Sequence, residues 1–119
     1  MGELGGLEVL DKATILDRLG GDEEILQAVA QLFLQEADNY CRQLKDALAK
    51  GEAATLQRAA HTIKGLLATF VDDEGVQLAV AVEARSKAGD ADAVAAGAAA
   101  LEARVRQLAG LLRRTYPDL

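Results

Sequence analysis

The hydrophobic positions along most of this chain recur every three or four residues, which is the spacing of an amphipathic α-helix. The clearest stretch spans residues 22–50, where a predicted buried stripe continues for about seven turns. Its members are Ile25, Val29, Leu32, Phe33, Tyr40, Leu44, Ala47 and Leu48. Leu34 and Cys41 lie off the centre of this stripe, beside Ala30 and Ala37. The stripe predicts a long helix whose apolar arc widens towards solvent. We expect most of this wider arc to contact a second neighbouring helix in the core, with a docking surface at Leu34 as the alternative.

Glycines and aspartates divide the chain into further helices. Residues that end a helix or cap its start stand at Gly20-Gly21, Asp22, Lys50-Gly51, Asp72-Asp73, Gly89 and Asp90. The expected helices cover residues 11–19, 22–50, 52–70, 72–89 and 90–116, after a flexible lead-in at residues 1–10. Because the connections are short, neighbouring helices should pack antiparallel. We expect one all-α domain over residues 11–119, an antiparallel up-and-down four-helix bundle with an additional short N-terminal helix.

The composition supports a helical fold and excludes several functions. Half of the 119 residues are apolar, which is enough for one core. A net charge of −6 leaves no basic face for a nucleic-acid backbone. One cysteine, Cys41, and one histidine cannot form an internal disulfide or a four-ligand zinc site. With no signal peptide and no run of about eighteen apolar residues, we expect a cytoplasmic monomer without membrane insertion.

The single histidine, His61, lies in the predicted helix at residues 52–70. Placing each side chain at about 100° per residue puts five apolar residues opposite the imidazole. These are Leu56, Ala59, Ile63, Leu66 and Phe70. His61 should therefore face outward. Its neighbours on the same face, three, four or seven positions away, are Gln57, Arg58, Lys64, Gly65 and Ala68.

Two further features of this helix favour phosphoryl chemistry. No carboxylate occurs between Ala53 and Val71, so within this helix His61 has only the cations Arg58 and Lys64 nearby. A positive face of this kind suits a phosphoryl group. Gly65 costs the helix about 1 kcal/mol relative to Ala. Either it gives a partner close access to His61, or it accommodates a tight helix contact.

The segment Ala60-His61-Thr62-Ile63-Lys64-Gly65 resembles the signature of histidine-containing phosphotransfer (HPt) domains, an H-x-[LI]-K-G helix whose histidine accepts phosphate. Residues 19–24, Phe33, residues 44–48 and Glu83 also stand where the family pattern has them, so the resemblance covers nearly the whole chain. The chain departs from the pattern after the histidine helix. There it has Leu66, Leu67 and Val71, where the family commonly has two small residues and a glycine.

The resemblance implies that His61 accepts the phosphoryl group, that Lys64 supports its oxygens and that Gly65 clears space for the partner. Lys87 would be the equivalent of the polar or basic groups that the family often places on the following helix. The partners would be response-regulator receiver domains and a sensor or hybrid histidine kinase. His61 would take the phosphoryl group from a receiver aspartate or a kinase and pass it to another receiver aspartate.

The expected carrier has no cofactor of its own, because a helix without carboxylates offers no ligands for Mg²⁺, which is expected on the partner receiver. The chain also lacks a glycine-rich nucleotide loop and a Ser or Cys nucleophile paired with a second base. We therefore expect a phosphocarrier that is not an enzyme. The alternative is a helical interaction module in which the apolar arc around Leu34 binds another helix and His61 has no chemical role.

Overall fold

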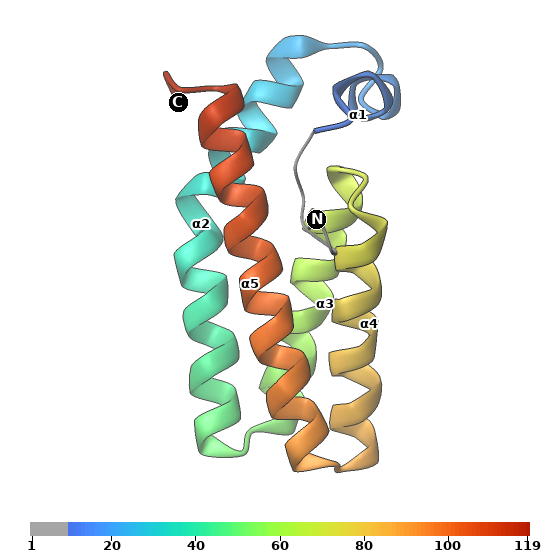
Figure 1. Ribbon diagram of the computed structural model, residues 1–119, viewed down its shortest axis with the longest axis vertical. Helices are drawn as coiled ribbons and strands as arrows, with labels where there is room; N and C mark the ends of the chain where they lie inside the picture. Colours follow the sequence, from blue (N-terminus) through green and yellow to red (C-terminus); the bar gives the residue numbers. More distant parts are fainter. Residues whose placement is uncertain (1–9) are drawn as a thin grey trace, which may run out of the picture.

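The computed structural model of the chain describes residues 10–119. Its helices are α1 (Lys12–Arg18), α2 (Glu23–Lys50), α3 (Ala53–Thr69), α4 (Asp73–Ala88) and α5 (Ala91–Thr115). Helices α2 to α5 lie side by side and alternate in direction, and α1 covers the end where α3 turns into α4 (Figure 1). This confirms the antiparallel up-and-down four-helix bundle with a short N-terminal helix. The predicted lead-in lies, except for Leu10, outside the described residues.

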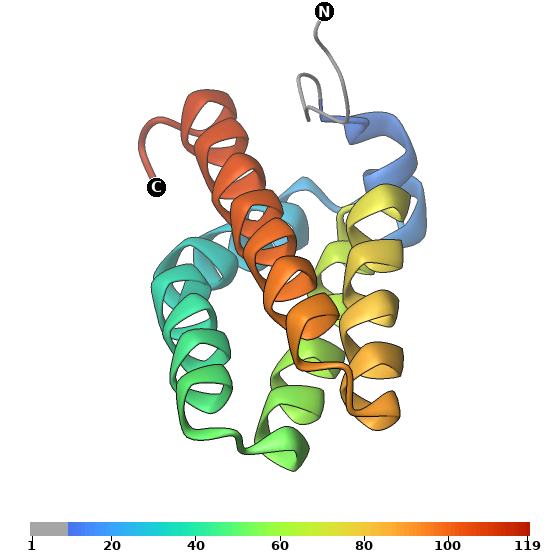
Figure 2. The ribbon, with the colours of Figure 1, turned by 60° about the horizontal axis from the view of Figure 1, so that its bottom comes forward.

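Local capping explains where the helices begin and end. The Asp22 side chain accepts hydrogen bonds from the backbone N–H groups of Glu24 and Ile25 at the start of α2. Gly51 and Gly89 end α2 and α4 with φ angles of 68° and 78°, which glycine adopts without strain. The observed helices thus start and end beside the predicted residues. Figure 2 shows the α2–α3 and α4–α5 turns next to each other at one end of the bundle.

The core follows the predicted apolar positions in most of α3. In α5, the apolar residues that recur every three or four positions are buried: Val94, Ala98, Leu101, Val105, Leu108 and Leu112. Phe33 of α2 meets Phe70 edge to face, with ring centroids 5.6 Å apart. Leu67, at a position where the family pattern has a small residue, is fully buried, and Leu66 is partly buried. The core therefore accommodates these two larger side chains.

The predicted buried stripe of α2 is partly wrong. Ile25 and Leu32 are 45% and 54% exposed, and Leu26 is fully buried in their place. Beside the centre of the stripe, Ala30, Ala37 and Cys41 are buried, which agrees with the expected contact of this wider arc with a second helix. Small side chains allow α2 to approach its neighbours closely, so they line the contact while larger aliphatic residues remain at its edge. Because the stripe was assigned from the largest apolar residues, its predicted buried face is rotated about the axis of α2 relative to the observed buried face.

The turn between α3 and α4 has an unusual backbone. Val71 adopts a φ of 58°, in the left-handed region that a β-branched residue rarely occupies. The buried Asp72 caps α4 by accepting the N–H of Gly75 at 3.1 Å, and it pairs with Arg104 of α5 at 2.6 Å. A Cβ at position 75 would lie 2.8 Å from Asp72 Cγ, so only glycine fits there. The ion pair fixes the turn against α5 and helps to hold Val71 in its strained conformation.

Candidate functional site

His61 stands in the middle of α3 with 70% of its side chain exposed. The opposite side of the helix is almost inaccessible to solvent, at Leu56, Ala59, Ile63, Leu67 and Phe70. The outward orientation derived from the helical period is therefore correct. The buried side anchors the helix, and the imidazole remains open to a visiting molecule.

A carboxylate from the neighbouring helix completes the site. Glu83 of α4 places Oε2 3.6 Å from Nδ1 of His61 and Oε1 3.0 Å from Nζ of Lys64. The Glu83 side chain is only 17% exposed. Helix α3 itself has no carboxylate near His61, but α4 supplies one, Glu83. Glu83 also stood in the family pattern, but the sequence reasoning gave it no role in the site.

A signal for this contact was present in the chain. Helices α3 and α4 form an antiparallel hairpin whose turn lies at Asp72, and residues 61 and 83 are equally distant from it. The hydrogen bond from Gln57 Nε2 to Ser86 Oγ, at 3.3 Å, joins the two helices about one turn further from Asp72, in nearly the same register. Pairing the positions across the predicted turn would have placed Glu83 beside His61.

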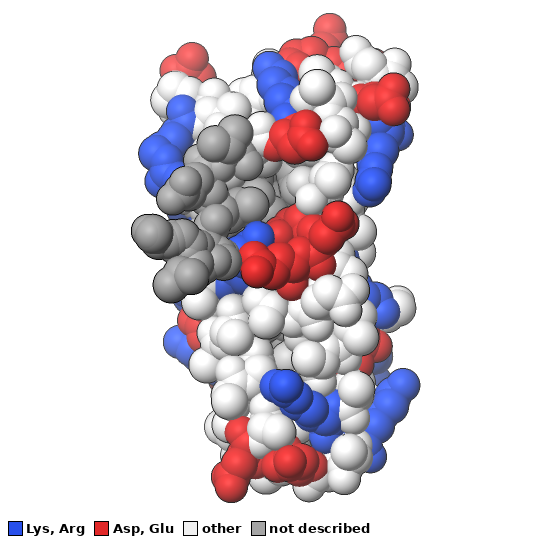
Figure 3. Space-filling view, turned by 45° about the vertical axis from the view of Figure 1, so that its right-hand side comes forward, with Lys and Arg blue, Asp and Glu red and all other residues white. Residues whose placement is uncertain are grey.

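His61 borders an open hollow of about 520 Å³ between α3 and α4. Three of the predicted neighbours line it with His61, namely Gln57, Arg58 and Lys87. The guanidinium of Arg58 donates to Thr55 Oγ1 at 3.4 Å. Among residues 10–119, neither Arg58 nor Lys87 pairs with an acidic side chain. Figure 3 shows Lys and Arg side chains in the lower part of the face that includes α4, with Asp and Glu side chains below them. The hollow therefore carries two cations that remain available to an anionic partner.

The structure bears on one of the two interpretations of Gly65, the tight helix contact. The residue is exposed, and a Cβ built on it would meet nothing within 4 Å. Within residues 10–119, no tight helix contact therefore requires the glycine, and its role in giving a partner access stays a prediction. Its carbonyl accepts a hydrogen bond from Thr69 Oγ1 at 3.0 Å. Ala68, two turns from His61 along α3, is partly buried and does not line the hollow.

Leu34 is not brought to the histidine. It is partly buried against the core and does not line the hollow at His61, so a docking role for it stays a prediction.

Cys41 is fully buried, and burial raises the pKa of its thiol. Within residues 10–119, no three His, Cys, Asp or Glu side chains gather to hold a metal ion. In the same part of the chain, no helix is long and apolar enough to cross a membrane.

An exposed histidine on a four-helix bundle is the arrangement expected of a helical phosphotransfer carrier. The chain belongs to the Hpt domain family, whose model matches residues 28–111. It is similar to the protein named Phosphorelay protein LuxU in Vibrio vulnificus strains YJ016 and CMCP6. The identity is 29% over 79 residues, or 66% of this chain and 67% of each relative. No solved structure matches the chain.

Family and relatives together identify a histidine phosphocarrier of a phosphorelay, as the sequence predicted. Kinases and receivers are the partners of such a carrier. The predicted domain bounds of 11–119 stay a prediction, because the family match covers a shorter range.

Proposed function

We propose that His61 is the residue that accepts the phosphoryl group and passes it on. One observation carries this assignment: the chain has a single histidine, and its side chain is 70% exposed in the middle of α3. A histidine phosphocarrier needs an imidazole that another protein can reach. Since the other side of α3 is anchored in the core, His61 offers that imidazole at a fixed position.

Glu83 supports attack through Nε2. A carboxylate 3.6 Å from Nδ1 favours the tautomer with its proton on Nδ1, which leaves the lone pair on the outer nitrogen, Nε2. Nε2 attacks the phosphorus of an aspartyl phosphate. The N–P bond forms, the P–O bond to the aspartate breaks, and the aspartate leaves as a carboxylate. The proton stays on Nδ1, so the positive charge of the phosphoimidazolium faces Glu83. The reverse reaction hands the phosphoryl group to another aspartate.

Lys64 is placed to stabilise the phosphoryl oxygens. Its ammonium lies 3.0 Å from Glu83 Oε1, yet no donor among the described residues is aligned for a hydrogen bond to that oxygen. Lys64 therefore keeps its donors available while Glu83 holds it near the imidazole. Once a phosphoryl group is present, charge-assisted hydrogen bonds to it attract Lys64 more strongly than the loose ion pair does.

The surface around these three residues is the proposed docking face for the receiver. Gly65 leaves open space beside His61, and Gln57, Arg58 and Lys87 line the adjoining hollow. The two cations attract the acidic pocket that an aspartyl phosphate and its Mg²⁺ ligands form on a receiver. Ala68 lies at the edge of this face.

We place the Mg²⁺ ion on the receiver, since Glu83 is a single carboxylate beside His61 and, within residues 10–119, no three His, Cys, Asp or Glu side chains gather to hold a metal ion. The carrier itself is proposed to be no enzyme: it exchanges a phosphoryl group with receiver domains or a sensor or hybrid histidine kinase, which bring the remaining catalytic groups. The monomeric state and the cytoplasmic location stay predictions.

Transfer from a receiver tests the proposal. A receiver domain phosphorylated with acetyl phosphate and Mg²⁺ is mixed with the carrier, and the carrier is analysed for acid-labile, alkali-stable phosphate. We expect label on the wild type and none on His61→Gln, whose amide keeps the size and polarity but lacks the nucleophile. Label that persists in His61→Gln would refute the assignment. A wild type that binds receivers yet never takes up phosphate would favour the interaction module instead.

A further inference from the structure

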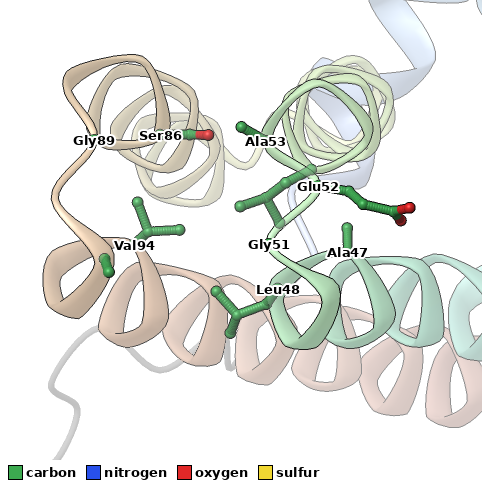
Figure 4. Close-up of a pocket in the computed structure, with 10 residues that line it drawn as sticks. Ala47, Leu48, Gly51, Glu52, Ala53, Ser86, Gly89 and Val94 are labelled. Carbon is green, nitrogen blue, oxygen red and sulfur yellow. The ribbon is translucent and has the colours of Figure 1, made fainter.

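A second hollow, which we call the end cavity, lies at the end of the bundle where the α2–α3 and α4–α5 turns meet (Figure 4). Its volume is about 230 Å³. Leu48, Leu56 and Val94 supply apolar walls, and the exposed Ala53 and Ala91 border its mouth. Sites for small molecules usually measure about 300–1,000 Å³. The end cavity is smaller than that range and suits a single apolar side chain.

The end cavity adjoins the hollow at His61. The hydrogen bond from Gln57 to Ser86 joins a residue that lines the His61 hollow to one that lines the end cavity. Along α3, Ala53 at the mouth is eight residues from His61, or about 12 Å at 1.5 Å per residue. A standard interface buries about 800 Å² on each partner, equivalent to a disc of about 16 Å radius. A partner centred on His61 would therefore reach Ala53, which borders the mouth of the end cavity.

We propose that the receiver domain docked on His61 inserts one apolar side chain into the end cavity, an inference that rests on the proposed function of His61. The two hollows have complementary properties. The His61 hollow contains Arg58 and Lys87, which attract an acidic active site, whereas the end cavity offers an apolar anchor. The partner is thus a receiver with a Leu, Met or Phe exposed about 12 Å from its phosphorylated aspartate. A second copy of this chain fits less well, because each copy carries a net charge of −6.

Filling the end cavity tests this proposal. Ala91→Leu places a larger side chain at its mouth, and Ala96→Leu makes the same change on an exposed part of α5 that lines neither hollow. The probe is the receiver that takes phosphate fastest from the phosphorylated carrier, and its dissociation constant is measured by calorimetry. We expect Ala91→Leu to raise that constant about tenfold, which corresponds to about 1.4 kcal/mol, and Ala96→Leu to leave it unchanged. Labelling of His61 by phosphoramidate, which needs no receiver, should be equal in both variants.

Ala53→Leu enters from the opposite side of the mouth and serves as an independent variant if Ala91→Leu alters the helix content. Wild-type affinity in either folded variant overturns the proposal. A change in self-association, measured by sedimentation, with unchanged receiver affinity would assign the end cavity to a second copy and also overturn it. Failure of the wild type to be labelled at His61 by phosphoramidate or receiver would instead refute the proposed function, so the two failures are distinguishable.

Discussion

Replacing Glu83 by Gln tests whether its charge stabilises the phosphorylated imidazole. Gln keeps the shape and an acceptor oxygen but removes the negative charge that lies 3.6 Å from Nδ1. The His61 side chain is mostly exposed, so an effective dielectric constant of about 40–80 applies. At 3.6 Å, Coulomb's law then gives about 1–2 kcal/mol between the carboxylate and a phosphoimidazolium. We therefore expect the transfer equilibrium to shift about 5- to 30-fold towards the receiver aspartate.

The assay must separate this charge effect from the role of Glu83 in holding Lys64. Phosphorylated receiver is mixed with each carrier, and the fraction of label on His61 at equilibrium is measured for the wild type and for Glu83→Gln. The same pair is then measured in a Lys64→Met background, in which there is no ammonium to release. If Glu83 acts on Nδ1, its effect persists in that background; if it acts only by restraining Lys64, the effect disappears.

Glu24→Gln is the matched control, since Glu24 is exposed in the first turn of α2, far along the chain from the α3–α4 hairpin. It should leave the equilibrium unchanged. Circular dichroism and thermal unfolding establish that each variant is folded. An equilibrium constant for Glu83→Gln equal to that of the wild type in both backgrounds would refute the electrostatic reasoning. A larger fraction of label on His61 would show that release of Lys64 outweighs the lost carboxylate charge.

Four further outcomes can be measured. Lys64→Ala should shorten the lifetime of the phosphohistidine without loss of helicity, and unchanged decay would remove Lys64 from the mechanism. Gly65→Leu should stabilise the protein by about 1 kcal/mol in denaturant unfolding yet weaken receiver binding, and undiminished affinity would contradict the access role. Val71→Gly should be more stable than Val71→Ala by about 1 kcal/mol, the reverse of their order within a helix. The hydrogen bond from Lys12 lowers the pKa of Glu23, so Glu23→Gln should be less stable than the wild type at pH 7, with the difference vanishing as the pH falls below the ordinary value of 4.5.

The sequence predicted the helices well because each boundary is set by local chemistry. Asp22 and Asp90 supply caps through their own side chains, and Gly51 and Gly89 adopt backbone angles that other residues avoid. The outward direction of His61 was equally accessible, since it depends only on the helical period and on the apolar residues of the same helix. Features that arise within one helix and its caps could therefore be predicted from the sequence.

Features that depend on two helices were harder to predict. The rotation of α2 is set by how closely Ala30 and Ala37 let it approach its neighbours, and a pattern weighted towards large residues misses this. The contact of Glu83 with His61 requires the register of the α3–α4 hairpin. That register can be derived from the sequence, because His61 and Glu83 are equally distant from Asp72 in the predicted turn. It requires the positions of two helices to be paired, which the pattern within one helix does not show.

For two glycines inside helices, Gly65 and Gly97, the sequence alone could not show what offsets the cost of a glycine to the helix. Gly65 and Gly97 carry the same cost relative to Ala, about 1 kcal/mol each. A Cβ at Gly97 would lie 3.3 Å from Val82 Cγ2 and from Arg85 Nη1, so close packing of α5 on α4 offsets that cost within the chain. At Gly65 a Cβ would meet nothing, and no contact within the described residues offsets the cost. A benefit at Gly65 is therefore not found within residues 10–119, in keeping with the proposal that this glycine gives a receiver access to the face of α3 that carries His61.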